Sequence, residues 1–382
     1  MDLNQPVVVP FNRPASAERS IEYVTNVLTS GRESGDGPFT KRASVLLAEL
    51  VGGGETLLTT SCTHALEMAA ILANVGPGDE VILPSFTFVS TANAFVLRGA
   101  RPIFADITPD TLNIDPESVR RLVSERTKAL CVVHYAGVGC DMDAIGSIAF
   151  DRGLVLIEDN AHGLFAARRG KPLGNFGQLA TQSFHETKNL STGEGGALVI
   201  NDESMRERAE IIREKGTNRS RFFRGQVDKY SWVDVGSSYL PAEVIAALLL
   251  AQLEDSTRIQ ARRHEIWAAY DSQLSTWAFE NAVRRPQVPD DCVHPAHMYY
   301  LLMPDLECRS RFIEHLRAHG VLAVFHYLPL HLSEFAQRYG GAAGDCPVTE
   351  GVSDRLVRLP LFADMTEDQL TLTIATIESF RA

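Results

Sequence analysis

The chain has 382 residues, 45% of them hydrophobic, which is enough for a sizeable core and for two domains. Its formal net charge of −12 argues against a nucleic-acid surface but leaves room for local basic clusters that bind small anions. The sequence shows neither a secretion signal at its start nor an apolar run of membrane-spanning length. We therefore expect a cytoplasmic protein without nucleic-acid or membrane partners.

Short apolar runs alternate with helical patterns between residues 56 and 201. The runs span 56–60, 80–84, 102–107, 129–134, 154–159, 180–185 and 196–200, and residues 115–127 and 142–153 have helical spacing. This alternation predicts an α/β fold with a mostly parallel sheet covered by helices. Ligands bind beyond the carboxyl ends of the strands in such sheets, where we expect the turn at 61–66, Asp159 and Lys188 to emerge.

A smaller α+β domain is expected after a long helical pattern at 241–274, which we take as the connector. Its expected elements are apolar runs at 297–303 and 321–331, a helix near 308–319 and a closing helix from about 365. We assign residues 1–255 to the large domain and 256–382 to the small domain. Residues 334–350 have the composition of a loop.

The spacing of cysteines and histidines gives no sign of a metal site. The six cysteines form no CxxC pair. His315 and His319 lie four residues apart on an expected helix, but no HExxH motif or third ligand accompanies them. We expect reduced thiols, solvated histidines, no disulfide framework and no bound metal.

Lys188 lies in a turn between two apolar runs, and a turn lysine is ordinarily a solvated charge. Here only 6 of the 36 basic residues are lysines, so a purely solubilising role would more often fall to arginine. A lysine amine can lose its proton near neutral pH and condense with a carbonyl. Lys188 is therefore a candidate for binding an aldehyde cofactor such as pyridoxal 5′-phosphate (PLP).

The sequence also offers the other groups that PLP needs. Asp159 ends a strand, where its carboxylate can keep the ring nitrogen protonated, although a strand-end Asp is by default a turn or cap residue. Thr63 and His64 open a helix whose amides can bind the phosphate, and plain N-capping of that helix is an equal alternative. Phe88 follows another strand and can cover the ring, although core packing is the default for a phenylalanine.

Motifs along nearly the whole chain resemble those of the DegT-like PLP-dependent sugar aminotransferases. They include SCTHALEMAA (61–70), PSFTFVSTANAF (84–95), IEDNAHG (157–163), SFHETKN (183–189) and RLPLF (358–362). The resemblance implies the aspartate aminotransferase fold (PLP fold type I), with a large domain around a mostly parallel seven-stranded sheet and a smaller α+β C-terminal domain. Within the family, the run at 213–240 resembles the dTDP-4-amino-4,6-dideoxygalactose transaminases.

The resemblance implies roles for individual residues. The implied catalytic residues are Lys188, Asp159 and His185. The implied cofactor-binding residues are Thr63, His64, Phe88, Asp159, His162, Ser183, Lys188 and Ser238. Many relatives have Gly-Tyr-Asn where this chain has Gly236, Ser237 and Ser238, and that Asn reaches the phosphate from the neighbouring subunit.

A basic segment, residues 213–229, is expected to bind a diphosphate, because arginine pairs with phosphates bidentately. The plainer alternative for such a charge run is a solvated loop. We expect Tyr135, at a strand end, and residues of FHYLPLH (325–331) to contact the sugar. The expected substrate-binding residues are Tyr135, Lys215, Arg219, Arg221, Arg224, His326, Tyr327 and His331.

The resemblance implies transfer of an amino group from L-glutamate to a nucleotide-linked 4-keto-6-deoxyhexose, dTDP-4-keto-6-deoxy-D-glucose, in a homodimer with shared active sites. Three alternatives stay open: a C3 sugar aminotransferase, a PLP-dependent sugar dehydratase and a non-catalytic PLP-binding regulator. The dehydratases typically have His at the position of Lys188, which speaks against the second. A Schiff-base aldolase without PLP would leave Asp159 and Ser183 without a purpose.

Overall fold

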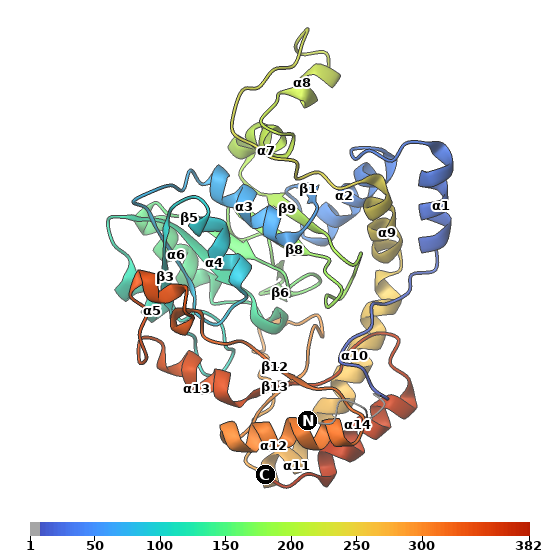
Figure 1. The fold of residues 1–382 in the computed structure, drawn as a ribbon, viewed down its shortest axis with the longest axis vertical. Coiled ribbons are helices and arrows are strands. Elements are labelled where there is room, and N and C mark those ends of the chain that lie inside the picture. The colour runs from blue at the N-terminus through green and yellow to red at the C-terminus, as the bar shows by residue number, and fades with distance from the viewer. Residues whose placement is uncertain (1–7) are drawn as a thin grey trace.

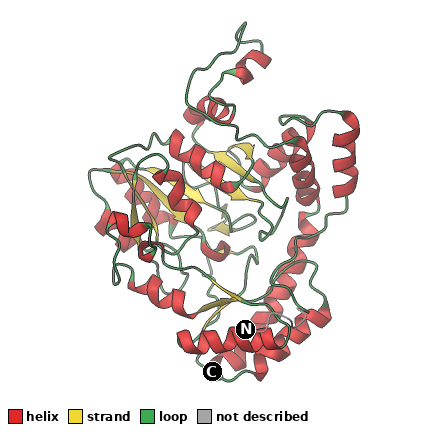
Figure 2. Cartoon of the chain, in the orientation of Figure 1, coloured by secondary structure: helices red, strands yellow, loops and turns green. Residues whose placement is uncertain are grey.

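The computed structural model describes residues 8–382, so the first residues, on which the expectation of no secretion signal partly rests, lie outside the described part. A seven-stranded sheet forms the centre of the larger part (Figures 1 and 2). Its strands are β1 (Glu55–Thr59), β2 (Glu80–Pro84), β3 (Arg101–Ala105), β4 (Thr127–Val133), β5 (Val155–Asp159), β8 (Leu179–Ser183) and β9 (Gly196–Ile200). Their spatial order is β1-β9-β8-β5-β4-β2-β3, and in this sheet β9 runs antiparallel to both of its neighbours.

Side-chain alternation along the strands separates two buried faces of this sheet. One face packs against α3 (Cys62–Leu72), α4 (Val89–Val96) and α7 (Arg206–Arg213). The other packs against α1 (Ser20–Ser30), α2 (Pro38–Leu50), α5 (Pro116–Leu122), α6 (Met142–Arg152) and α9 (Glu243–Glu254). Because helices cover both faces, polar groups that serve a ligand are left to the carboxyl edge.

The smaller part lies at the end of α10 (Ser256–Gln273), which leads away from the large sheet (Figure 1). Its antiparallel sheet has the order β11-β13-β12, with β11 (Tyr300–Leu302), β12 (Val324–Phe325) and β13 (Leu356–Arg358). Its helices are α11 (Ser275–Glu280), α12 (Leu306–Ala318), α13 (Pro347–Arg355) and α14 (Glu367–Ser379). A third sheet joins β10 (Cys292–Val293), β6 (Ala167–Arg168) and β7 (Lys171–Pro172).

Three expected elements differ from the structure. The helical pattern at 241–274 forms two helices, because Asp255 interrupts it between α9 and α10. Residues 321–331 contain only a two-residue strand, since Pro329 lacks the backbone donor that a longer strand needs. Part of the expected loop at 334–350 is helical, because Pro347 stands in the first turn of α13.

The domain division at 255/256 stays a prediction. Val9 forms a bridge with Val321 and packs in the core of the smaller part, so the N-terminal segment contacts that core as well. Residues 213–240, which we call the arm, run from α7 to α9 and present the short helix α8 (Arg219–Phe223) beyond the sheet (Figure 1). Among residues 8–382, no helix combines the length and apolarity that crossing a bilayer requires.

Candidate active site

The carboxyl ends of the strands bring the expected site residues to one edge of the large sheet. Asp159 is the last residue of β5 and Ser183 the last of β8. Lys188 lies in the turn after β8, Tyr135 follows β4, and Thr63 lies in the first turn of α3, just after β1. This is the edge at which ligands bind in open α/β sheets.

Asp159 is a carboxylate with 5% of its surface exposed. Its Oδ2 accepts a hydrogen bond from Thr91 Oγ1 at 2.7 Å, and its Oδ1 accepts one from the backbone N–H of Ala161 at 3.3 Å. Burial raises the pKa of Asp159, while Thr91 and Lys188 offset part of the increase. A buried carboxylate of this kind is well suited to pair with a protonated ring nitrogen.

Lys188 is partly buried in the turn, where its backbone N–H donates to the carbonyl of His185 at 2.9 Å. Desolvation lowers the pKa of its amine to about 8, the negative charge of Asp159 opposes this decrease, and the charge of Arg358 adds to it. A substantial fraction of the amine is therefore uncharged near neutral pH, as a nucleophile requires.

The N-terminus of α3 lies beside β9. Ser61 caps the helix, with its Oγ accepting from the backbone N–H of His64 at 3.1 Å. Within residues 8–382, the backbone N–H groups of Cys62 and Thr63 make no hydrogen bond, so they remain available for an anion. A Cβ on Gly196 would lie 2.3 Å from Cys62 N, so the absence of a side chain there lets β9 approach the helix end.

Two histidines stack beside Lys188. The ring centroids of His162 and His297 are 4.4 Å apart with an interplanar angle of 21°, and burial lowers the pKa of both far below the usual value. His297 Nδ1 lies 2.7 Å from Oδ1 of Asn189, the residue after Lys188. His162 Nδ1 is buried without a hydrogen-bond partner in the described part of the chain, which leaves it available to a bound group or a water molecule.

Aromatic side chains pack between the two parts of the molecule. Tyr135 is 1% exposed, and its Oη lies 3.0 Å from Nδ1 of His326. Burial raises the pKa of Tyr135 and lowers that of His326, so a neutral hydroxyl and a neutral imidazole share this hydrogen bond. The Tyr327 ring lies 5.7 Å from Phe86 and 6.4 Å from Phe88, which is 57% exposed.

The profile of the DegT/DnrJ/EryC1/StrS aminotransferase family matches residues 14–378. The chain belongs to this family. The spore coat polysaccharide biosynthesis protein SpsC of Bacillus subtilis is 34% identical over 379 residues, which cover 97% of this chain and 96% of that protein. The aminotransferase TlmJ of Streptoalloteichus hindustanus matches with a TM-score of 0.89 and 32% identity, covering 97% of this chain and 98% of that one.

A further solved structure bears on the cofactor. The putative sugar aminotransferase Spr1654 of Streptococcus pneumoniae, in its PLP-form, matches with a TM-score of 0.89 and 26% identity over 97% of this chain and 98% of that one. The expected family and the aspartate aminotransferase fold are confirmed. The aminotransferases of this family depend on PLP, so the expected cofactor is confirmed as well.

The residues at the carboxyl edge fit this cofactor. The amine of Lys188 is suited to bind the aldehyde, and the carboxylate of Asp159 to pair with the ring nitrogen. The free amides of Cys62 and Thr63 suit the phosphate. The Nδ1 of His162 adds a polar atom that has no hydrogen-bond partner among residues 8–382.

Other expected residues are engaged within the protein, and their functional roles stay predictions. The side chain of His185 is 42% exposed, and its Nδ1 lies 3.0 Å from Thr187 Oγ1. Ser183 Oγ accepts from the backbone N–H of His185 at 3.5 Å. The ring of His64 is hydrogen-bonded to Thr60 and lies edge-on to Tyr239, with centroids 5.1 Å apart.

His331 uses both ring nitrogens inside the protein. Nδ1 lies 2.6 Å from Ser85 Oγ and Nε2 lies 3.0 Å from Glu350 Oε1, and the residue is 1% exposed. In this arrangement neither nitrogen is free for a sugar. Of the FHYLPLH segment, His326 and Tyr327 face Tyr135, whereas His331 joins the two parts of the molecule.

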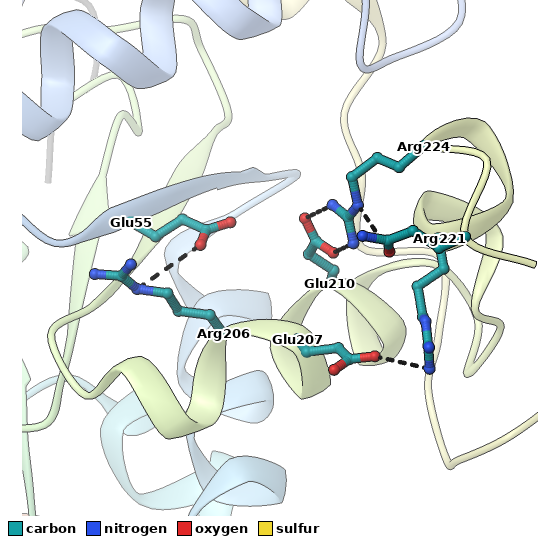
Figure 3. A pocket seen from close by; sticks show the side chains of 7 residues that line it. Glu55, Arg206, Glu207, Glu210, Arg221 and Arg224 are labelled. Carbon is teal, nitrogen blue, oxygen red and sulfur yellow. Dashed lines mark hydrogen bonds and ion pairs between the residues drawn. The ribbon is translucent and has the colours of Figure 1, made fainter.

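Two arginines of the arm are paired with glutamates on α7 of the same chain. Arg224 forms a bidentate pair with Glu210 on α7, with both distances 2.8 Å, and Arg221 lies 3.2 Å from Glu207. These four side chains, together with Glu55 and Arg206, line a cavity of about 480 Å³ (Figure 3). To contact a diphosphate as expected, Arg221 and Arg224 must therefore either leave their glutamates or bind the glutamate and the diphosphate together.

Lys215 and Arg219 both approach the buried carboxylate of Glu214, at 3.8 and 3.9 Å. Ser238 is exposed and forms an isolated backbone bridge with Glu214. Within one chain, these residues lie at the base of the arm. Any contact of Ser238 with a phosphate in a neighbouring subunit stays a prediction.

Three residues of the site were missed by the sequence analysis: Thr91, His297 and Arg358. For Thr91 a signal existed, because Thr87 and Thr91 are spaced i, i+4 at the start of α4 and their hydroxyls lie 2.9 Å apart. His297 and Arg358 carry no local signal, since both belong to the smaller part and reach the site through domain packing.

Proposed function

We propose that this aminotransferase transfers the amino group of L-glutamate to C4 of dTDP-4-keto-6-deoxy-D-glucose, giving the 4-amino-4,6-dideoxy sugar. The observation that carries the substrate is the run REKGTNRSRFFRGQVDKYSWVDVGSSYL at 213–240, which resembles the corresponding run of dTDP-4-amino-4,6-dideoxygalactose transaminases. A sugar substrate is also supported by the names of SpsC, a polysaccharide biosynthesis protein, and of Spr1654, a putative sugar aminotransferase.

In the proposed reaction, Lys188 carries out the proton transfers, and Asp159 holds the charge of the ring. When bound, PLP withdraws electrons from the carbon that carries the amino group. Lys188, with a pKa of about 8, accepts the proton from Cα of the amino acid and later delivers a proton to C4 of the sugar. Asp159 keeps the proton on the ring nitrogen throughout, which its burial beside Thr91 favours.

The aromatic wall serves to orient the sugar and to exclude water. Tyr135 and His326 are buried and neutral, so the wall is apolar apart from the remaining imidazole nitrogen of His326. Phe88 and Tyr327 extend this wall to the protein surface, where Phe88 is exposed. A deoxy sugar, with an apolar C6 methyl group, suits contact with such rings.

We propose further that the protein acts as a homodimer in which the arm docks on a second copy. The arm projects beyond α7 and exposes large apolar side chains: Phe223 is 69%, Tyr230 52% and Trp232 82% exposed. Exposed aromatic side chains clustered on a projecting segment are typical of an interaction site. An isologous contact would give each active site access to the partner's arm.

The product identifies the function. The purified holoenzyme is incubated with dTDP-4-keto-6-deoxy-D-glucose and L-glutamate, and the product is analysed by NMR. An amino group at C4 supports the proposal, and competition that favours a 3-keto isomer identifies the protein as a C3 aminotransferase. Loss of a hydroxyl without amination indicates a dehydratase, and bound PLP without turnover of either sugar indicates a regulator.

A further inference from the structure

The arm has no apolar core of its own. No residue between 217 and 238, all of which the structure describes, is buried in this chain. The large apolar side chains Phe223, Tyr230 and Trp232 are more than half exposed. Hydrophobic packing within one chain therefore does not set the direction of the arm, and polar contacts have to do so.

The base of the arm is a close crossing of its outgoing and returning segments. A backbone bridge joins Thr217 to Trp232. A Cβ on Gly236 would lie 2.2 Å from the backbone nitrogen of Gly216, so the two segments touch there. These contacts fix the two segments to each other, but α8 lies beyond them and needs contacts of its own.

Two ion pairs between α7 and the outgoing segment supply these contacts (Figure 3). Glu207 and Glu210 lie three positions apart on α7, and their two arginine partners have the same spacing. Arg224 donates two hydrogen bonds of 2.8 Å to Glu210, whose side chain is 16% exposed. Arg221 lies 3.2 Å from Glu207. Because the spacings match, a shift of α8 by one residue would break both pairs.

The returning segment of the arm is bound to the same helix. Arg208 on α7 donates from Nε to Oδ2 of Asp234 at 2.8 Å. Its Nη1 donates to Oδ1 of Asn74, just after α3, at 2.5 Å. Charged side chains of α7 therefore anchor both segments of the arm.

The pairing with α7 sets which side of α8 faces outward. While Arg221 and Arg224 point to α7, Phe223 is 69% exposed. The Phe222 ring lies 5.8 Å from that of Tyr230, so the aromatic side chains of the outgoing and returning segments form one cluster. This aromatic cluster is the face that meets a second copy in the proposed homodimer.

We propose that Glu207 and Glu210 are positioning residues, which hold the arm in the orientation in which its aromatic cluster meets a second copy of the chain. An arm that is ordered before association avoids the entropic cost of being ordered at that moment. In this role Arg221 and Arg224 act through the placement of the arm, and a direct contact with the diphosphate is the alternative. The inference rests on the proposed homodimer and does not depend on which sugar is aminated.

A charge swap tests the pairing. Glu210→Gln and Arg224→Gln each remove the bidentate pair, and each should raise the Kd of the dimer about fivefold in sedimentation experiments. Combining the two substitutions should cost no more than either alone, within about twofold. Glu210→Arg together with Arg224→Glu restores opposite charges and should return Kd to within about threefold of the wild type.

Glu203→Gln is the matched control. Glu203 pairs with Arg206 at 3.0 Å, also three positions away, but this pair lies outside the arm. We expect the Kd of the dimer to stay within about twofold of the wild type in this variant.

Hydrogen exchange gives a readout that needs neither turnover nor a second copy. In dilute, monomeric protein, the amides of residues 221–226, which bond within α8 and the turn after it, report the order of the arm. They should exchange about fivefold faster in Glu210→Gln than in the wild type and return to the wild-type rate in the charge swap.

Binding of dTDP to the dimeric holoenzyme, measured by calorimetry, separates the alternative. We expect the charge swap to bind dTDP within about twofold of the wild type. If Arg224 binds the diphosphate directly, Glu210→Gln should free it and tighten dTDP binding, while the swap should weaken binding at least about tenfold. That pair of results would overturn the proposal.

These measurements separate the inference from the proposed function. A wild type that stays monomeric at all concentrations contradicts the proposed homodimer, and hydrogen exchange still shows whether Glu210 orders the arm. Unchanged exchange of residues 221–226 in Glu210→Gln contradicts the inference in either case and leaves the proposed reaction intact.

Discussion

Thr91 donates a hydrogen bond of 2.7 Å from its Oγ1 to Oδ2 of Asp159, and both side chains are buried. The bond joins the first turn of α4 to the end of β5, two elements that lie 68 positions apart in the sequence. It opposes the effect of burial on Asp159, since it favours the ionised carboxylate. Thr91 therefore helps to keep the charge that a protonated ring nitrogen requires.

Thr91→Val should weaken the enzyme without unfolding it. Loss of a hydrogen bond to a charged group costs about 1.5–3 kcal/mol, which corresponds to about a tenfold to 100-fold loss of kcat. The pKa of Asp159 should also rise, so the acid limb of the pH–rate profile should move to higher pH. Thr91→Ser retains the hydroxyl and should keep the wild-type profile, and identical profiles for Val and wild type would remove Thr91 from this role.

The pKa of Lys188, lowered to about 8, predicts how apoenzyme recovers PLP. Only the uncharged amine attacks an aldehyde, so the rate should rise about tenfold per pH unit below pH 8 and level off above it. The measurement follows the visible absorbance band of lysine-bound PLP between pH 6 and 9. Lys188→Ala should show no such band and no multiple turnover, and a pH-independent rate in the wild type would contradict the assignment of the titrating group.

Glu158, the neighbour of Asp159, is expected to contribute to the stability of the fold. It lies on the opposite face of β5, where it accepts hydrogen bonds from His134 Nε2 at 2.9 Å and from the backbone N–H groups of Gly174, Phe176 and Gly177 at 2.9, 2.6 and 2.7 Å. These bonds outweigh burial and lower the pKa of Glu158. Glu158→Leu leaves the donors unpaired and should reduce the free energy of unfolding by about 3–5 kcal/mol at pH 7.

Urea unfolding measures this loss, and Glu203→Leu, at an exposed ion pair, should change stability by less than about 0.5 kcal/mol. Because the folded pKa of Glu158 is lowered, its contribution is complete above the ordinary carboxyl pKa and is lost as pH falls through the folded value. The difference between wild type and Glu158→Leu should therefore shrink in acid. A constant difference down to low pH would show that its charge is not the cause.

The arm predicts complementation between inactive subunits. Lys188→Ala lacks the catalytic amine, and a second variant has Arg219, Arg221 and Arg224 changed to Gln. If the arm serves the partner's active site, mixed dimers contain one site with intact Lys188 and an intact arm, so activity should partly return on subunit exchange. A verified mixed dimer without recovery would show that the arm serves its own subunit or does not bind substrate.

The sequence by itself predicted the strands of the large sheet and the two central residues of the candidate site. Strand-length apolar runs separated by helical patterns predicted the seven strands close to their observed bounds, because parallel strands buried on both faces give unbroken apolar runs. Asp159 at a strand end and Lys188 in the turn after another strand were local signals. Parallel topology brings such positions to one edge, so both could be assigned before any contact was known.

Tertiary structure alone decided what the smaller part contributes. His297 stacks on His162, and Arg358 lines a cavity together with Thr187, the residue before Lys188. Both contacts exist only because the smaller part packs against the carboxyl edge of the large sheet. The partners of the basic segment could not be predicted from the sequence either. Its composition indicated an anion site, whereas the fold pairs Arg221 and Arg224 with glutamates of α7. Periodicity and spacing report the surroundings of a residue along the chain, whereas the partner of a charge is set by distances between segments that the sequence keeps apart.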